Sequence, residues 1–370
     1  MRLKLPTAEG RSENYTLVGT PLRTAKPRAP FNRIAFAAAH VVANPLGGTD
    51  WERTIAYRRY LMGLGFNIAE AMDTSQRGMG LDWPMALELI TRSLADAGKD
   101  ARRIYSGCGT DHLSQVRTLD DVVKGYLEQL HAVQKLGGRV IMMASRALVR
   151  VAKSADDYAK VYARALAEAD HPVILHWLGE MFDPALKGYW GASPMETCLS
   201  VIAANAKKID GIKISLLDDK KEIDMRQRLP PSVKMYTGDD FNYPALIAGD
   251  DQGYSHALLG IFDAIAPAAS LALAALAKGN TKKYNALMAP TVPLSRLIFR
   301  APTQFYKTGI VFLAWLNGHQ DHFIMVAGAQ SMRPITDFAE IFRLADQAGL
   351  LRDPELGLKR MKQLLAIHGL

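Results

Sequence analysis

The chain has 370 residues, of which 49% are hydrophobic and 22% are charged, a composition typical of a soluble globular protein with a sizeable core. Its 45 Lys and Arg residues are scattered among 37 Asp and Glu residues, so the formal net charge of +8 predicts a mildly basic surface that favours anionic small molecules and excludes a nucleic-acid partner. The two cysteines, Cys108 and Cys198, have no metal-binding spacing around them, which predicts reduced thiols in a cytoplasmic protein and no metal or other cofactor.

The N-terminal 30 residues contain four prolines before any clear hydrophobic period begins, which predicts an N-terminal arm or small hairpin over residues 1–30, packed on the main domain. These residues lack the long apolar core of a signal peptide. A later apolar run, 258–277, contains Asp263 and Pro267, so we interpret it as a strand end followed by a buried helix. We therefore expect no membrane partner.

Strand and helix patterns then alternate along the chain. The predicted strands are 34–40, 66–70, 103–108, 139–143, 172–176, 209–215, 233–237 and 253–259. The predicted helices between and after them are 50–64 with Thr49 or Asp50 as its cap, 83–97, 119–136, 154–169 with Ser154 as its cap, 194–206, a short charged helix ending at Arg228, and an alanine-rich helix from Pro267.

Eight such strand–helix repeats over about 245 residues predict a (β/α)₈ TIM barrel, which we assign to residues 31–278. The alternative, a doubly wound open sheet, lacks a GxGxxG turn to support it. Four further helices at 281–298, 303–317, 335–348 and 353–367 predict a C-terminal helical extension over residues 279–370, packed on the barrel.

One lysine lies inside the sixth predicted strand. The period of two places Gly211, Lys213 and Ser215 on one face of this strand. A lysine that points into a strand-lined interior has a lowered pKa, because burial disfavours its charged form, and its amine then becomes a nucleophile for Schiff-base chemistry. The alternative is a lysine at a frayed strand end that pairs with Asp218 or Asp219.

Polar residues at the strand ends are the candidates for an active site, since barrel active sites lie where strands lead into βα loops. They are Glu70, Asp73, Thr74, Ser75, Thr110, Asp111, His112, Ser145, Arg146, His176, Lys213, Ser215, Asp239, Asp240, Ser255 and His256. We expect them to converge on one mouth of the barrel.

Several of these candidates have two interpretations. His176 suits general acid–base catalysis but is equally a core histidine with satisfied hydrogen bonds, and His112 is a base, a ligand or a loop residue. The pair Asp239 and Asp240 either contacts substrate or caps the following helix. The hydroxyls of residues 74 and 75 either bind a carboxylate or shape a turn.

Over roughly residues 33–350 the pattern resembles the dihydrodipicolinate synthase and N-acetylneuraminate lyase family. The resemblance rests on the strand that ends at His176, where the family has tyrosine, on the Gly-Ile-Lys element that ends at Lys213, where it has its Schiff-base lysine, and on the Gly-Asp-Asp of residues 238–240. It implies a class I aldolase barrel that self-associates, with a small-molecule carbonyl substrate.

The sequence also departs from this family at three places. Residues 72–77, Met-Asp-Thr-Ser-Gln-Arg, replace the family's Gly-Thr-Thr-Gly-Glu carboxylate loop, His176 replaces its tyrosine, and Ser145 with Arg146 replaces its aromatic pair. These differences indicate a divergent branch with a different substrate, in which Thr74 and Ser75 supply some of the missing donors.

The leading hypothesis is therefore a Schiff-base aldolase, lyase or dehydratase acting on a 2-keto acid or a sugar-acid derivative. Lys213 forms the imine, His176 moves the proton, and either Arg146 or Arg77 holds an acid or phosphate group. Substrate contacts are assigned to Thr74, Ser75, His112, Arg146, Ser215, Asp239 and Asp240.

Two alternatives remain open. The first is a metal-dependent sugar isomerase or epimerase on the same barrel, with ligands drawn from Glu70, His112, His176, Asp239 and His256. The second is a binding barrel without catalysis, which the replaced carboxylate loop supports.

Overall fold

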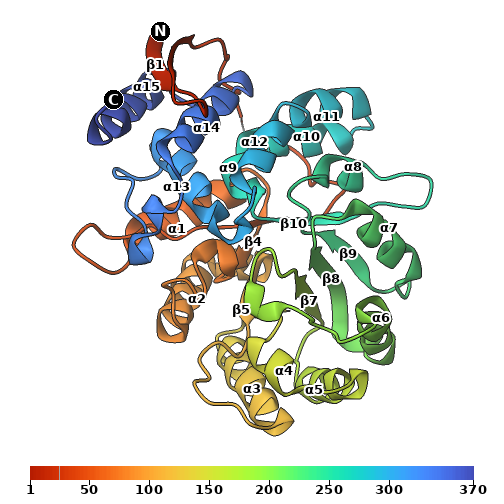
Figure 1. The fold of residues 1–370 in the computed structure, drawn as a ribbon. Coiled ribbons are helices and arrows are strands. Elements are labelled where there is room, and N and C mark those ends of the chain that lie inside the picture. The colour runs from red at the N-terminus through yellow and green to blue at the C-terminus, as the bar shows by residue number, and fades with distance from the viewer. Residues whose placement is uncertain (25) are drawn as a thin grey trace. The chain divides into compact units, whose positions relative to one another are not determined.

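A computed structural model describes residues 1–24 and 26–370. Eight parallel strands form a closed barrel, in the order β10-β3-β4-β5-β6-β7-β8-β9 (Figure 1). The strands are β3 Ala35–Ala38, β4 Asn67–Glu70, β5 Ile104–Cys108, β6 Arg139–Met142, β7 Val173–Leu178, β8 Ile209–Ser215, β9 Lys234–Thr237 and β10 His256–Leu259. The predicted (β/α)₈ barrel is confirmed.

Helices follow the strands along the chain and continue beyond the last of them. They are α1 Trp51–Gly63, α2 Trp83–Ala97, α3 Leu119–Lys135, α4 Arg146–Val151, α5 Ala155–Ala167, α6 Pro194–Ala204, α7 Asp219–Arg228, α8 Tyr243–Ala248, α9 Ile261–Ala264, α10 Ala266–Leu276, α11 Thr281–Met288, α12 Thr291–Ile298, α13 Tyr306–Leu316, α14 Ile335–Gln347 and α15 Pro354–Ile367. The C-terminal helices α11 to α15 confirm the predicted helical extension.

The chain divides into two compact units. The barrel unit consists of residues 33–38 and 67–259 and contains all the barrel strands, and the terminal unit consists of residues 1–32, 39–66 and 260–370. The N- and C-terminal segments of the sequence thus belong to the same unit.

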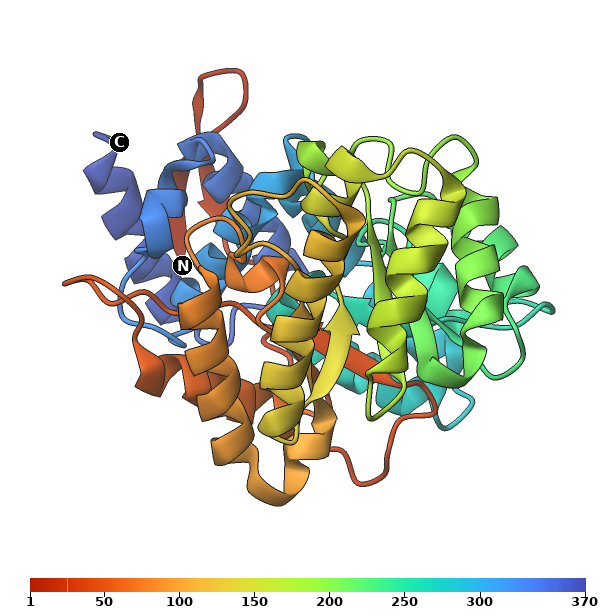
Figure 2. The ribbon, with the colours of Figure 1, turned by 90° about the horizontal axis from the view of Figure 1, so that it is seen from below.

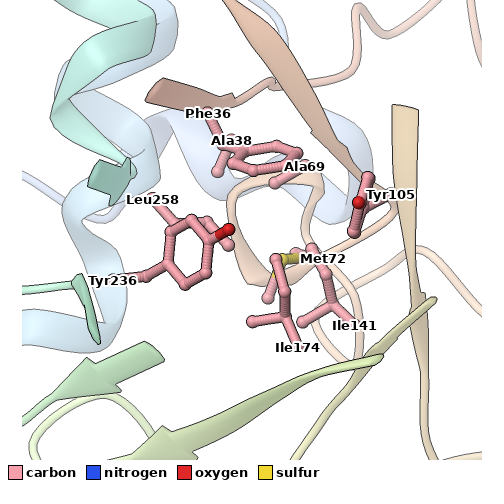
Figure 3. Close-up of a cluster of buried hydrophobic side chains, with 9 residues drawn as sticks. All are labelled: Phe36, Ala38, Ala69, Met72, Tyr105, Ile141, Ile174, Tyr236 and Leu258. Atoms are coloured by element: carbon pink, nitrogen blue, oxygen red, sulfur yellow. The ribbon is translucent and has the colours of Figure 1, made fainter. Parts of the chain in front are cut away.

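The interior of the barrel contains a cluster of buried apolar side chains, which come from the barrel strands except for Met72, which follows β4. Figure 3 shows this cluster, which consists of Phe36, Ala38, Ala69, Met72, Tyr105, Ile141, Ile174, Tyr236 and Leu258. The ring of Phe36 packs edge-on against Tyr105 at 5.0 Å and against Tyr236 at 5.9 Å between ring centroids. The barrel therefore has a packed core and is not a pore.

Helices of the barrel unit begin at polar caps that the sequence supplies. The Asp82 carboxylate accepts a hydrogen bond from the backbone N–H of Met85 at the start of α2, and Thr118 and Asp121 form a capping box on α3. Ser154 is the predicted N-cap of α5. Figure 2 shows α2, α3, α5 and α6 side by side in chain order.

In the terminal unit the N-terminal residues form an antiparallel hairpin of β1 Arg2–Pro6 and β2 Ser12–Thr16, which confirms the small hairpin predicted there. The hairpin and the segment after it are held by Asp346 on α14, which accepts hydrogen bonds from the Tyr15 hydroxyl and the Val18 N–H, both at 2.8 Å. Figure 1 shows β1 beside α14.

Two boundary predictions are wrong. The helix predicted over 281–298 is divided into α11 and α12 at Ala289–Pro290, because proline has no N–H to continue a helix. Ser255 and His256 lie at the beginning of β10, so they do not reach the C-terminal mouth; the polar pair precedes the apolar residues that form the strand.

The apolar run 258–277 contains the end of β10 followed by α9 and α10, as predicted. Among the described residues, no helix is both long enough and apolar enough to cross a membrane.

Candidate active site

Lys213 points into the barrel. It is aligned in register with His176 on β7 and with Tyr236 on β9, and Tyr236 belongs to the interior cluster. Aligned residues of neighbouring strands face the same side of a sheet, and Lys213 is only 4% exposed. The prediction that the Lys213 side chain faces the interior is thus confirmed. The alternative, in which Lys213 lies at a frayed strand end, is wrong.

Two glycines make room on this face. A Cβ atom at Gly238, which follows β9, would lie 2.7 Å from Lys213 Cε and 2.3 Å from Ser215 Oγ. A Cβ atom at Gly211 would lie 2.5 Å from the ring of Tyr236. The lysine side chain therefore occupies space that only glycine leaves open at residue 238.

The burial of Lys213 favours its neutral amine. Burial lowers the pKa of Lys213, and the negative charges of Asp73 and Asp240 oppose this shift. In the part of the chain that the structure describes, no residue accepts a hydrogen bond from Lys213 Nζ. A buried amine without an acceptor that fixes it is suited to attack a carbonyl.

His176 lies beside this lysine. Its Nε2 atom is 3.1 Å from Ser215 Oγ, and the residue is 2% exposed. Burial lowers the pKa of His176 well below its usual value, and the charge of Lys213 lowers it further, while Asp73 opposes both effects. The imidazole is therefore neutral at pH 7 and is able to accept a proton.

A pocket opens at the C-terminal ends of four consecutive strands, β4 to β7. It is lined by Asp73, Arg77, Gly78, Gly109, Thr110, Asp111, Met143, Ala144, Arg146, His176, Leu178, Asp183 and Leu186. His176 thus belongs to the pocket wall, whereas Lys213 is its neighbour in register on β8.

Arg77 connects the loops of this pocket through hydrogen bonds and an ion pair. Its guanidinium forms a bidentate pair with Asp111, with both N···O distances at 2.8 Å. It also donates to the carbonyls of Ala71 and Gly107 and to the Gln129 side chain. Because these contacts engage all five N–H donors of an arginine, Arg77 has none left for a substrate.

Arg146 differs from Arg77 in its partners. Its Nε atom donates to Asp183 Oδ2 at 2.5 Å, and its side chain is 46% exposed. The terminal nitrogens lie beside Gly78, where a Cβ atom would be 3.4 Å from Nη2. Of the two arginines that the sequence suggests for holding an anion, Arg146 is the one with available donors.

Other predicted site residues lie outside the pocket wall. Thr74 and Ser75 are buried within the single 3₁₀ turn Asp73–Ser75. His112 contacts the Gln129 side chain through Nδ1 at 2.7 Å and Glu128 through Nε2 at 3.2 Å. Their assignment to substrate binding stays a prediction.

Asp239 and Asp240 have different surroundings. Asp239 accepts hydrogen bonds from the backbone N–H groups of Phe241 and Asn242 at 2.8 and 2.9 Å, in the turn before α8, so it does not cap this helix, whose N-cap is Asn242. Asp240 is 4% exposed and acts electrostatically on Lys213. Only the second of the two is coupled to the lysine.

The metal ligands of the isomerase alternative are dispersed. Glu70 accepts hydrogen bonds from Ser93 Oγ at 2.6 Å and from the Ala71 N–H at 2.9 Å, and His256 Nδ1 accepts from the Ile34 N–H at 3.0 Å at the other end of the barrel. Within residues 1–24 and 26–370, no three His, Cys, Asp or Glu side chains converge as a metal site would require.

Sequence reasoning did not assign roles to Asp73, Asp183 and Gly238. Asp73 was among the strand-end candidates but was not distinguished from its neighbours, although it acts on both Lys213 and His176. Asp183 is 37 residues from Arg146, and no local pattern links them. For Gly238, the only indication in the sequence was its place in the Gly-Asp-Asp element of residues 238–240.

The fold is similar to that of solved dihydrodipicolinate synthases. A prophage protein of the dihydrodipicolinic acid synthase family from E. coli K12, in complex with pyruvate, matches with a TM-score of 0.70 at 13% identity, over 86% of this chain and 99% of its own. The chloride-inhibited Acinetobacter baumannii enzyme, complexed with pyruvate, has a TM-score of 0.66 at 17% identity, over 86% and 99%. The Aquifex aeolicus enzyme has a TM-score of 0.67 at 12% identity, over the same shares.

The predicted resemblance is therefore confirmed at the level of the fold. No curated protein gives a significant match. A family model described as "Protein of unknown function (DUF993)" matches residues 3–370.

Proposed function

This chain belongs to the DUF993 family of proteins of unknown function, and we propose that it is a Schiff-base-forming aldolase, lyase or dehydratase acting on a 2-keto acid or a sugar-acid derivative. The observation that carries the proposal is the position of Lys213, which is buried, points inward and has a lowered pKa. Two relatives by fold are complexed with pyruvate, so small 2-keto acids are the first substrates to test.

In the proposed mechanism, the neutral amine of Lys213 attacks the substrate carbonyl to form a carbinolamine. Its oxygen then leaves as water, with one proton from the amine and one from solvent, so that a protonated imine remains. The resulting iminium withdraws the electron pair of the neighbouring bond as that bond breaks. His176 accepts or returns the proton through its Nε2 atom, and Ser215 Oγ at 3.1 Å orients the ring. Asp73 stabilises the positive charge on either group.

Borohydride trapping tests this proposal. In the presence of pyruvate and larger 2-keto acids, reduction of the imine should add the mass of the reduced acid to the peptide that contains Lys213. Lys208, which donates to two backbone carbonyls of the barrel unit, provides an internal control and should stay unmodified. Absence of any adduct at Lys213 across the panel, together with full activity of Lys213→Ala, rules the mechanism out.

The binding-barrel alternative predicts a different outcome. A keto acid that raises the melting temperature without forming an adduct at Lys213 would support binding without catalysis. We also propose that the protein forms homo-oligomers, because of the family resemblance, and light scattering of the purified chain measures this directly.

A further inference from the structure

We propose that the substrate carries a second anionic group, a carboxylate or a phosphate, and that Arg146 binds this group through its two terminal nitrogens. The inference rests on the proposed function in one respect: the carbonyl of the same substrate is placed at Lys213. It assigns a substrate class to the pocket.

The first step concerns the orientation of Arg146. Its Nε atom donates to Asp183 Oδ2 at 2.5 Å, while Asp183 Oδ1 accepts from the Ala185 N–H at 3.1 Å. Asp183 is therefore fixed to the backbone and holds the guanidinium by one edge. Such a pre-oriented arginine loses less conformational freedom when it binds a ligand.

The second step concerns the donors that remain. Asp183 accepts only from Nε, and among the hydrogen bonds of the described residues none is donated by Nη1 or Nη2 of Arg146. The end of a guanidinium presents two parallel N–H groups, a geometry that matches the two oxygens of a carboxylate or phosphate. The free end of Arg146 is thus a bidentate anion site.

The third step concerns access to this end. Gly78 has a φ of 73°, and a Cβ atom there would lie 3.4 and 3.5 Å from the terminal nitrogens of Arg146. Any larger side chain at residue 78 would extend from that position. Glycine therefore leaves the guanidinium uncovered within the pocket.

The fourth step concerns the other charges of the pocket. Arg77 is neutralised by Asp111 and has no free donor. Asp73 acts on the pair His176 and Lys213. An incoming anion therefore finds its hydrogen-bond donors at Arg146, on the same pocket wall as His176.

Matched ligand pairs test the proposal by calorimetry. 2-Oxopentanedioate is compared with 2-oxopentanoate, in which a methyl group replaces the second carboxylate, and 3-phosphonooxypyruvate is compared with 3-hydroxypyruvate, which lacks the phosphate. We expect the charged member of at least one pair to bind roughly tenfold to a hundredfold more tightly, as charge-assisted bidentate hydrogen bonds do. The pair that shows the preference identifies the group as carboxylate or phosphate.

Arg146→Gln should abolish this preference, while Arg150→Gln, an exposed arginine on the same helix α4, should retain it. The ratio within a pair is informative because a general structural defect weakens both ligands alike. Equal binding of both members of each pair, no detectable binding of any of them, or a preference that survives in Arg146→Gln overturns the inference.

Trapping at Lys213 separates this inference from the proposed function. Adducts with both members of a keto-acid pair but no anion preference leave the Schiff-base function intact and remove the role of Arg146. An anion preference that depends on Arg146, without adducts, leaves the anion site intact and removes the lyase.

Discussion

Replacing Gly238 by alanine tests whether the position of Lys213 depends on the space that this glycine leaves. The new methyl group would lie 2.3 Å from Ser215 Oγ, 2.6 Å from the carbonyl oxygen of Ile214 and 2.7 Å from Lys213 Cε. All three distances are shorter than non-bonded contacts allow. The hydroxyl and the lysine are able to rotate away, but the carbonyl belongs to the β8 backbone, and Gly238 itself donates its N–H to that oxygen at 2.9 Å.

We expect Gly238→Ala to lower the free energy of unfolding by about 3 kcal/mol, the upper end of the usual cost of overpacking. It should also reduce trapping at Lys213, because the lysine side chain is displaced. Urea denaturation and mass spectrometry measure the two effects. The double variant Gly238→Ala/Ser215→Gly should recover only part of the stability, since the contact with the Ile214 carbonyl remains.

Gly63→Ala serves as the control, because a Cβ atom at Gly63 would have no neighbour within 4 Å. It should leave stability unchanged or slightly raise it. A Gly238→Ala variant with wild-type stability and wild-type trapping would refute the reasoning.

Two further predictions concern charged groups inside the barrel unit. Lys213→Met should stabilise the protein at pH 7, because burial lowers the pKa of Lys213 from 10.5. Below pH 10.5 the folded wild-type protein binds fewer protons than its unfolded chain, so its free energy of unfolding rises with pH. The stability advantage of the variant therefore disappears as the pH approaches 10.5. Urea denaturation over this range measures it, and a pH-independent advantage would contradict it. Arg77→Gln should lower the free energy of unfolding by about 1–3 kcal/mol, since the carbonyls of Ala71 and Gly107 lose their buried donor. Arg77→Lys should not rescue it, because an ammonium does not reproduce the bidentate pair with Asp111.

The barrel was predictable because its signal is local. Each strand is a short apolar segment bounded by turn residues, and the period of two was sufficient to place Lys213 and Ser215 on the inner face of β8. The alignment of His176 with Lys213 was not predicted, because the order of the strands does not fix their register, and it comes from the structure. The strands and the face of Lys213 thus require no knowledge of distant contacts, whereas the register does.

The loops around the pocket were not predictable for the opposite reason. Arg77 forms hydrogen bonds to the loop after β4, to the end of β5 and to Gln129 on α3, which is 52 residues away. Nothing near Arg77 in the sequence indicates that all its donors are used. His256 was predicted at the wrong end of its strand. The sequence alone does not show whether a polar residue beside an apolar run begins or ends the strand. The partners of a long polar side chain depend on tertiary packing.

The two titratable groups at the centre of the site are coupled through their charges. Lys213 lowers the pKa of His176, while Asp73 raises the pKa of both. A positive charge on one group therefore disfavours a positive charge on the other, while the carboxylate of Asp73 favours the charged form of each. An amine nucleophile beside a neutral base requires this arrangement, because the proton that leaves the amine has an acceptor within the same cluster. In the family that the sequence resembles, a tyrosine stands where this chain has His176. Because a phenol titrates near pH 10 while burial keeps the imidazole of His176 unprotonated at pH 7, the mechanism proposed for this chain uses a base that needs no activation by a second group.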